Sequence, residues 1–446
     1  MRIRTRDSGN GNGDTNGYRT REGRERAVLG ALRRSSQRRF EVEESLDELA
    51  GLAAAAGAEV VERVIQERPS PSPALYFGKG KVDEIAALAR RHGANVFISD
   101  DVLSPIQERN VAEALGIKVV DRTALILDIF AQRAHTAEGK LQVELAQLTY
   151  LLPRLIGQWK HLERLGGGIG TRGPGETQLE SDRRVIRRRM AKLKRELEGV
   201  QRHRGVQRQG RRRAGLPVVA LVGYTNAGKT TLLNRLTGST FTAANQLFVT
   251  LDPAARLVRD GGTSFVLTDT VGFIRKLPHE LVAAFRATLE ELKEADVLLH
   301  VVDASHPAMA EHMAAVEQML GELEVADRPT VLALNKIDRL DEPTRAALVG
   351  RREGVAVSAA TGDGVPALLA AIHAVLPVGG TVMLQIPHSD GTALAMCYER
   401  GRVVTRADGP AHVRLEVELP SGVAAALAGY RVEDARLSGT WGSPTH

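Results

Sequence analysis

The sequence predicts an α/β fold divided into several domains, and three observations support that prediction. Segments that favour strands and segments that favour helices alternate from residue 40 to 135 and again from 218 onward, as in parallel sheets covered by helices. Between these regions, leucines recur at intervals of four and three, the spacing of a helical seam. The chain has 446 residues, too many for one core, and predicts about three domains.

The composition is that of a globular protein with mostly aliphatic cores, because 43% of the residues are hydrophobic and only 4% are aromatic. A single cysteine, Cys397, excludes an internal disulfide and fits a reducing compartment. No apolar run approaches the roughly 20 residues that span a bilayer. Residues 1–26 lack the apolar core of a signal peptide and predict a disordered tail. We therefore expect a cytoplasmic protein without a membrane span and leave peripheral membrane association open.

An N-terminal α/β domain is expected over 27–135. The expected helices and strands alternate as Asp47–Gly57, Glu59–Ile65, Lys79–Arg91, Asn95–Ser99, Pro105–Leu115 and Lys118–Val120. The motif GKGK at Gly78–Lys81 places two lysines at a helix start, where they could hold an anion. A solvated helix start is the alternative, since so short a motif is weak evidence.

An antiparallel helical hairpin with a glycine-rich tip is expected over 136–214. Its two seams consist of Leu141, Leu145, Leu148, Leu152 and Leu155, and of Ile186, Met190, Leu193, Leu197 and Val200. Pro153 lies inside the first seam and is a candidate kink.

The second helix of the hairpin is strongly basic. From Arg183 to Arg213 there are fourteen Lys and Arg residues, opposed only by Glu196 and Glu198. Like charges at helical spacing repel one another, so an anionic partner such as nucleic acid would stabilise the helix. The candidate RNA contacts on this helix are Arg187, Arg188 and Lys192. A solvated face remains the alternative.

The tip, GGGIGTRGPGETQ at 166–178, formally contains the dinucleotide fingerprint Gly168-x-Gly170-x-x-Gly173. That fingerprint requires a preceding strand, whereas a helix precedes it here. A loop that merely closes a hairpin needs about 2–5 residues. The glycines instead allow close backbone approach to RNA, where Arg172 could contact a phosphate or stack on a base.

A nucleotide-binding domain is expected over 215–378, beginning with the strand Val218–Val222. GYTNAGKT at Gly223–Thr230 fits G-x-x-x-x-G-K-[ST] and opens the helix Lys229–Leu236, which is the context that this phosphate loop requires. Its backbone N–H groups would surround phosphates, Lys229 would reach the β- and γ-phosphates, and the Thr230 hydroxyl would bind Mg²⁺.

Three further motifs follow in a fixed order, each after a strand. Asp269 in DTVG, after Ser264–Thr268, could hold Mg²⁺ through water, and the Gly272 N–H could meet the γ-phosphate. After DTVG comes the expected strand Asp296–Val302, which carries no motif. The next expected strand, Thr330–Leu334, leads to Asn335-Lys336-Ile337-Asp338. The last, Val355–Val357, leads to Ser358-Ala359-Ala360. The Asp338 carboxylate can accept two hydrogen bonds from guanine, and adenine offers no such donor pair. Lys336 could lie over the base, and the serine-alanine turn could meet guanine O6.

The four motifs predict a Ras-like P-loop GTPase domain. Thr250 in FVTLDP is the expected switch residue that joins Mg²⁺, with Thr242 as a weaker rival. The positions assigned to GTP are Gly223, Tyr224, Thr225, Asn226, Ala227, Gly228, Lys229, Thr230, Thr231, Phe248, Val249, Thr250, Asp269, Thr270, Val271, Gly272, Asn335, Lys336, Asp338, Ser358, Ala359 and Ala360. Mg²⁺ is assigned to Thr230, Thr250 and, through water, Asp269.

Phe273 stands where Ras-like enzymes place the glutamine that orients the attacking water. Phenylalanine cannot do this, so we expect slow hydrolysis by the free protein and completion by a partner, unless another side chain of this chain substitutes. A small α+β domain is expected over 379–446, with strands at Thr381–Ile386 and Val413–Leu419 and a helix at Thr392–Arg400.

The chain resembles the HflX family of GTPases over about residues 40–375. The resemblance rests on AQRAHTAEGKLQVELAQLTYLLPRL, GGGIGTRGPGETQLESDRR, GYTNAGKTTLLNRL, FVTLDP, DTVGFIRKLPH and NKID. It implies a monomeric GTPase that binds the large ribosomal subunit and its RNA, splits stalled or idle ribosomes, and brings the hairpin tip near the peptidyl-transferase centre. Two alternatives stay open: a nucleotide-gated RNA-binding module without splitting activity, and a GTPase whose hairpin serves for homodimerisation.

Overall fold

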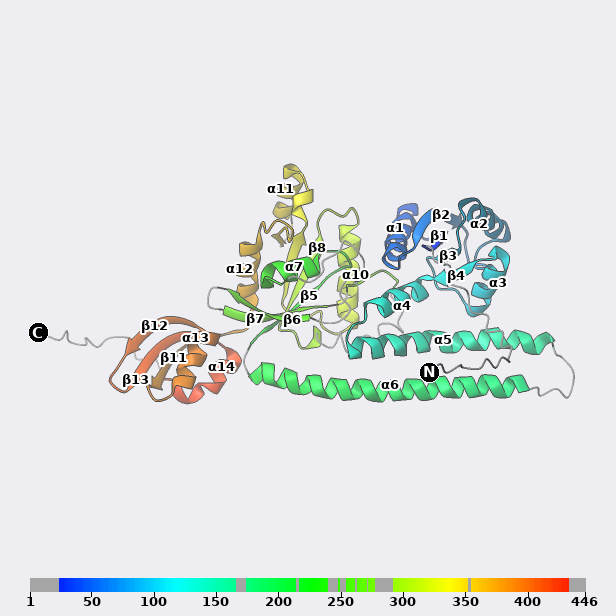
Figure 1. Ribbon diagram of the computed structural model, residues 1–446. Helices are drawn as coiled ribbons and strands as arrows, with labels where there is room; N and C mark the ends of the chain where they lie inside the picture. Colours follow the sequence, from blue (N-terminus) through cyan, green and yellow to red (C-terminus); the bar gives the residue numbers. More distant parts are fainter. Residues whose placement is uncertain are drawn as a thin grey trace, which may run out of the picture.

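Three β-sheets and a pair of long helices organise the chain in the computed structural model (Figure 1). The described residues are 24–165, 174–213, 216–239, 248, 254–260, 263–270, 272–276, 292–351 and 354–432. Within them, no helix combines the length and apolarity needed to cross a membrane. The sheets confirm the predicted α/β class, with a small α+β unit at the C-terminal end.

The first sheet is parallel, with strand order β2-β1-β3-β4, and is covered by helices on both faces. Its elements are β1 (Arg26–Arg33), α1 (Arg39–Ala55), β2 (Glu59–Glu67), α2 (Lys79–His92), β3 (Val96–Ser99), α3 (Pro105–Leu115), β4 (Lys118–Asp121) and α4 (Arg122–Arg133). Alternate residues of β1 face different cores: Leu29 lies in the core with α1 and α4, and Val28 lies in the core with α2 and α3. Burial on both faces explains the nearly continuous apolar run of β1.

The sequence prediction missed β1 and α4 and began α1 eight residues late, at Asp47 instead of Arg39. The start of α1 is rich in charged residues, yet Val42 and Leu46, four residues apart, are buried on one helix face. β1 was missed because it directly follows the polar N-terminal region. The other predicted elements of this region are confirmed, with small shifts at their ends.

The second sheet has six strands in the order β10-β9-β8-β5-β7-β6. Only β6 runs antiparallel to its neighbour. Its elements are β5 (Val218–Val222), α7 (Lys229–Thr237), β6 (Ala254–Asp260), β7 (Thr263–Asp269), β8 (Val297–Asp303), α10 (Met309–Glu322), β9 (Thr330–Asn335), the 3-10 helix η1 (Ile337–Arg339), α11 (Glu342–Arg351), β10 (Val355–Ala356) and α12 (Val365–Val375). β5 lies between β7 and β8, the point where the strand order reverses, which is where α/β sheets bind ligands.

The predicted hairpin is formed by α5 (Ala137–Leu165) and α6 (Pro174–Arg213), which lie side by side and run in opposite directions (Figure 1). Leu193 and Leu197 of the second predicted seam are buried. Val143 and Ala146 on another face of α5 join the core of the first sheet. The candidate kink residue Pro153 lies within α5, which continues as one helix through it.

The third sheet is antiparallel, with strand order β11-β13-β12. Its elements are β11 (Val378–Pro387), α13 (Gly391–Arg400), β12 (Arg402–Asp408), β13 (His412–Pro420), α14 (Ser421–Ala426) and the 3-10 helix η2 (Ala428–Tyr430). Cys397 is fully buried in its core. The sequence prediction included β11, α13 and β13 but missed β12, whose RVVTRAD carries three charged residues.

Candidate nucleotide-binding site

The phosphate loop begins where β5 ends, and its glycines are required by its geometry. Gly223 has φ of +151°, and a Cβ there would lie 2.2 Å from the Val301 carbonyl oxygen. Gly228 has φ of +96°, and a Cβ there would lie 2.2 Å from Asn335 Nδ2. No other residue fits at either position. The loop leads into α7, whose first N–H groups form an anion-binding helix terminus.

Lys229 is buried beneath this loop and its ammonium group is held by backbone carbonyls. Nζ donates hydrogen bonds to the carbonyl oxygens of Gly223 (3.0 Å) and Tyr224 (2.8 Å). Burial lowers the pKa of Lys229 to about 8; Asp269 opposes this shift and Lys336 adds to it. The loop therefore has a desolvated cation at its centre, suited to a phosphate group.

The DTVG motif lies directly against the phosphate loop. Thr230 Oγ1 donates a hydrogen bond to Asp269 Oδ2 (2.9 Å), and Thr270 Oγ1 donates to the Leu221 carbonyl (2.6 Å). A Cβ on Gly272 would lie 2.9 Å from Lys229 Nζ. The carboxylate assigned to Mg²⁺ thus meets the hydroxyl assigned to the same ion, and the Gly272 backbone borders the lysine.

The NKID motif connects the phosphate loop to the serine-alanine turn. Asn335 Nδ2 donates to the Ala227 carbonyl (2.8 Å), and Asn335 Oδ1 accepts from the Ala359 N–H (2.9 Å). Asp338 Oδ1 accepts from Ser358 Oγ (2.6 Å), which fixes the acid assigned to guanine. Lys336, assigned to cover the base, pairs with Asp303 (2.7 Å).

The three N–H groups assigned to guanine O6 differ in their bonds. That of Ser358 donates to the Asp363 carbonyl (2.9 Å), and that of Ala359 donates to Asn335. Among the described residues, Ala360 is the member of the turn whose N–H finds no acceptor. The geometry therefore favours Ala360 as the donor to guanine.

Phe273 is enclosed in the core below the phosphate loop. Its side chain belongs to an apolar cluster with Tyr224, Leu292 and Leu298 and is 4% exposed. Its backbone N–H donates to the Gly223 carbonyl (3.1 Å), and its carbonyl accepts from the Thr225 N–H (2.7 Å). The residue at the water-orienting position is thus a buried ring without a polar atom.

The N-terminal domain contacts the residues that follow Phe273, an arrangement that sequence reasoning missed. Arg275 pairs with Glu44 (2.6 Å). Lys276 pairs with Asp100 (2.5 Å) and Asp101 (2.8 Å). Both basic residues of the switch segment therefore bind acids from α1 and from the end of β3.

Tyr224 extends this contact into the phosphate loop. Its hydroxyl donates to Glu48 and accepts from the Arg275 N–H (2.9 Å). Arg122 lies behind, bonded to Glu48 and, at 2.7 Å, to Asp100. We call Glu44, Glu48, Asp100, Asp101, Arg122, Tyr224, Arg275 and Lys276 the inter-domain network. The sequence features that belong to this contact are the tyrosine in the phosphate loop and the Arg-Lys pair after the DTVGF motif. Neither feature indicates which residues it contacts.

Some predicted residues take other positions or cannot be placed. The Phe248 ring packs against Phe130 of α4 at 4.6 Å between ring centroids, with φ of +57°. The predicted residues that lie outside the described residues are Arg172, Thr242, Val249, Thr250 and Val271.

The candidate RNA contacts on α6 are exposed. Arg187 and Arg188 are exposed, and no described carboxylate lies within ion-pair distance of either. Lys192 is 3.7 Å from Glu196, whereas Arg189 holds Glu144 with two bonds of 2.6 and 2.7 Å.

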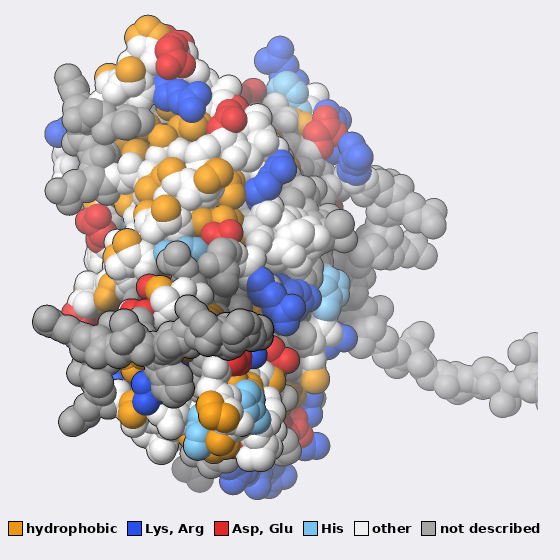
Figure 2. Space-filling view, turned by 90° about the vertical axis from the view of Figure 1, so that its left-hand side faces the viewer, with side chains coloured by type: hydrophobic (Ala, Val, Ile, Leu, Met, Phe, Trp, Pro, Cys, Tyr) orange, Lys and Arg blue, Asp and Glu red, His pale blue; other side chains and the backbone are white. Residues whose placement is uncertain are grey.

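Figure 2 looks at the end of the molecule with the third sheet, where Lys and Arg occur in small groups among other side chains. In the GKGK motif, Lys81 pairs with Glu84 of its own helix (2.7 Å), which favours the solvated helix start.

Three family models match successive parts of the chain. They are described as GTP-binding GTPase N-terminal (residues 43–131), GTP-binding GTPase Middle Region (133–211) and 50S ribosome-binding GTPase (218–336). Among solved structures, a GTP-binding protein from Sulfolobus solfataricus in complex with GDP is 26% identical, with 79% of this chain and 98% of that chain covered and a TM-score of 0.44.

Several similar proteins carry the name GTPase HflX. That of Caldanaerobacter subterraneus subsp. tengcongensis is 48% identical over 85% of this chain and 88% of that protein. The protein of Magnetococcus marinus is 46% identical over 92% of this chain and 96% of that protein. The protein of Escherichia coli K12 is 48% identical over 80% of this chain and 85% of that protein. Given this similarity over most of both chains and the three matching family models, the chain belongs to the HflX family and is a GTP-hydrolysing enzyme.

Proposed function

We propose that this GTPase binds the large ribosomal subunit through its hairpin, splits stalled or idle ribosomes, and is stimulated in turn by the ribosome. One family model that matches it is described as a 50S ribosome-binding GTPase, and its relatives are HflX proteins. The proposal assigns RNA binding to residues 136–214, GTP hydrolysis to 215–378 and a supporting role to 27–135. The protein acts as a monomer in the cytoplasm.

The burial of Phe273 supports a mechanism completed by a partner. At 4% exposure, the ring is held in the core and offers no group to orient a water molecule against the γ-phosphate. A partner that supplies this group, or moves the switch segment, accelerates hydrolysis; stimulation of this kind reaches about 10³–10⁵-fold in other GTPases. The ribosome is the partner that fits the basic hairpin.

The residues that would hold Mg²⁺ are Thr230 and Thr250 and, through water, Asp269. The Thr230 hydroxyl and the Asp269 carboxylate, 2.9 Å apart, are the hard oxygen ligands that Mg²⁺ prefers. When bound, the ion would supply positive charge against the β- and γ-phosphates. The chain's own part is to hold the phosphates with Lys229 and the backbone N–H groups.

The deciding experiment is co-sedimentation with ribosomes in the presence of a non-hydrolysable GTP analogue, followed by sucrose-gradient analysis of subunits. Arg187→Gln/Arg188→Gln should weaken binding and reduce its salt slope by about one log unit for each phosphate that the variant no longer neutralises. Arg90→Gln/Arg91→Gln, an equally exposed adjacent pair on α2, is the matched control and should change nothing.

The remaining outcomes separate the alternatives. Binding without subunit release would mean a nucleotide-gated RNA-binding module. Concentration-dependent self-association that requires the hairpin, without ribosome binding, would mean a dimerisation hairpin. Fast GTP turnover by the free protein, unchanged by large subunits, would refute the partner-completed mechanism.

A further inference from the structure

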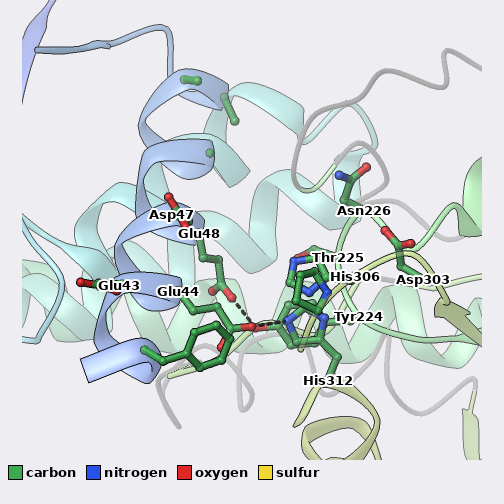
Figure 3. A pocket seen from close by; sticks show the side chains of 15 residues that line it. Glu43, Glu44, Asp47, Glu48, Tyr224, Thr225, Asn226, Asp303, His306 and His312 are labelled. Carbon is green, nitrogen blue, oxygen red and sulfur yellow. Dashed lines mark hydrogen bonds and ion pairs between the residues drawn. The ribbon is translucent and has the colours of Figure 1, made fainter. Parts of the chain in front are cut away.

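Three potential metal ligands from two domains meet beside the phosphate loop. Glu44 comes from α1, His306 from the segment after β8, and His312 from α10. One ligand atom from each lies within 4.8 Å of the others. In Figure 3, Glu44 and Glu48 extend from α1 toward Tyr224 and the two histidines, whereas Glu43 points away.

One carboxylate oxygen of Glu44 has no hydrogen-bond donor among the described residues. Its side chain is only 10% exposed, and its Oε2 is bonded to Arg275 at 2.6 Å. Its Oε1 is buried, lies 3.4 Å from His312 Nε2, and accepts no hydrogen bond from any described residue. A buried carboxylate oxygen without a donor is unfavourable, and a bound cation would satisfy it.

The two imidazoles are oriented before any ion binds. The His312 ring stacks on the Tyr224 ring, with centroids 3.8 Å apart and planes 6° apart. The His306 ring lies 4.4 Å from the His312 ring, and its Nδ1 accepts a hydrogen bond from the Ala308 N–H (3.1 Å). Ligation by His306 exchanges this bond for the bond to the metal.

The cavity beside the three residues is lined by carboxylates but by no basic side chain. Its volume is about 760 Å³, and none of its described lining residues is Lys or Arg. Arg275 reaches Glu44 from outside the lining. The other lining carboxylates, Glu43, Asp47, Glu48 and Asp303, pair with basic residues that also lie outside it, namely Arg39, Arg63, Arg122 and Lys336. The cavity also leaves room for water at an open coordination position.

We propose that Glu44, His306 and His312 form a zinc site that joins the N-terminal domain to the GTPase domain. Two imidazoles and one carboxylate, with an open fourth position, are a ligand set typical of Zn²⁺, whereas Mg²⁺ prefers oxygen ligands alone. Two ligands of a tetrahedral zinc ion lie about 3.3 Å apart. The three ligand atoms lie within 4.8 Å of one another, and Glu44 Oε1 and His312 Nε2 are already 3.4 Å apart, so small side-chain movements would bring them to this spacing.

The test uses the full-length protein with GDP and excess Mg²⁺, so that the nucleotide site is already filled. Zn²⁺ binding is measured by competition with a chromophoric chelator, and Co²⁺ binding by its visible absorption bands. The wild type should bind one equivalent. Glu44→Gln, His306→Asn and His312→Phe should each weaken binding at least about tenfold. His312→Phe keeps a ring stacked on Tyr224 and so separates ligation from packing.

His412→Asn, which removes an exposed histidine of the third sheet, is the control and should bind like the wild type. Zn²⁺ should raise the melting temperature of the wild type and of this control but not of the three site variants. The proposal is wrong if the wild type binds no Zn²⁺, or if all three site variants bind it as tightly as the wild type. Neither result depends on ribosome binding, so the proposed function is tested separately.

Discussion

The first sheet is parallel and the second is parallel except for β6, yet the carboxyl ends of their parallel strands carry opposite chemistry. In the second sheet, β5 ends in a loop of glycines with a buried cation, Lys229. In the first sheet, Asp100 and Asp101 directly follow β3, and β4 ends at Asp121. Both ends are where α/β sheets place ligands. Phosphate suits the first chemistry, and the basic switch residues of the other domain suit the second.

This difference shows that the sheet fixes the place of a site while the residues fix its partner. The acids after β3 hold Lys276, whereas Lys229 after β5 is held by a backbone carbonyl of the phosphate loop. Four changes, ordered from the largest expected effect to the smallest, should act differently on the acidic strand ends of the first sheet and on the nucleotide site of the second.

Of the changes considered, Arg122→Met should have the largest effect, a loss of stability of the first sheet. Arg122 is 1% exposed and joins Glu48 to Asp100, so its removal takes the cation from the buried Glu48 and leaves Asp100 with Lys276 alone. The loss should be about 3–5 kcal/mol, measured by native-state hydrogen exchange of the β3 amides. The exposed pair of Arg63 and Asp47 is the control, and Arg63→Met should cost at most about 1 kcal/mol. Equal effects of the two variants would contradict the role of the buried network.

Lys229→Ala should reduce GTP turnover by about 10²–10³-fold, because the loop loses its one buried cation against the phosphates. The comparable lysine of the first sheet is Lys118 in β4, exposed and paired with Glu25 at 3.0 Å. Lys118→Ala should leave turnover unchanged. Steady-state phosphate release measures both, and near-wild-type activity of Lys229→Ala would show that the loop does not use its lysine.

Acid should destabilise the second sheet before the first. Burial, with a contribution from Lys229, lowers the pKa of His300 in β8 from 6.5 to about 4. As the pH falls, the unfolded chain binds this proton at a higher pH than the folded chain does. The contribution of His300 to the free energy of unfolding is therefore complete above pH 6.5 and decreases by up to about 3 kcal/mol as the pH drops toward 4. Burial opposes ionisation of Asp100, but Arg122 and Lys276 outweigh it and lower its pKa, so its contribution persists to lower pH.

Hydrogen exchange of β8 and β3 amides between pH 7 and 4 measures this order. His300→Leu should flatten the pH dependence of β8, and the exposed control His412→Leu should not. Loss of β3 protection before β8 protection would reverse the expected order.

Asp338→Asn should lower GTP affinity by about 1.5–3 kcal/mol, roughly tenfold to 150-fold, because guanine loses a charged acceptor. The matching change at the strand end of the first sheet, Asp100→Asn, should leave nucleotide affinity unaltered. Calorimetry with GDP compares the two. Undiminished affinity of Asp338→Asn would remove this residue as the guanine selector.

Local patterns explain which features could be predicted from sequence. The glycines and Lys229 fall within eight consecutive residues after a strand, so the phosphate loop needs no tertiary information. The heptad spacing likewise predicted the buried Leu193 and Leu197 of α6. β12, which has three charged residues among seven, gave no such pattern.

Contacts between distant segments could not be predicted. Glu48 and Tyr224 are 176 positions apart, as are Asp100 and Lys276. No spacing rule connects a glutamate on α1 with two histidines near α10. Chemistry shared between domains depends on how two independently patterned surfaces dock, and a single sequence does not encode that as a local repeat.

Because α6 is long, a small rotation at one of its ends corresponds to a large displacement at the other. Its 40 residues span about 60 Å at 1.5 Å per residue. Only four residues, 214–217, separate its end from β5, the strand that carries the phosphate loop. A tilt of about 5° at that end would sweep the opposite end through about 5 Å over this length. With this geometry, a small reorientation beside the nucleotide would displace the far end of the hairpin by several ångströms.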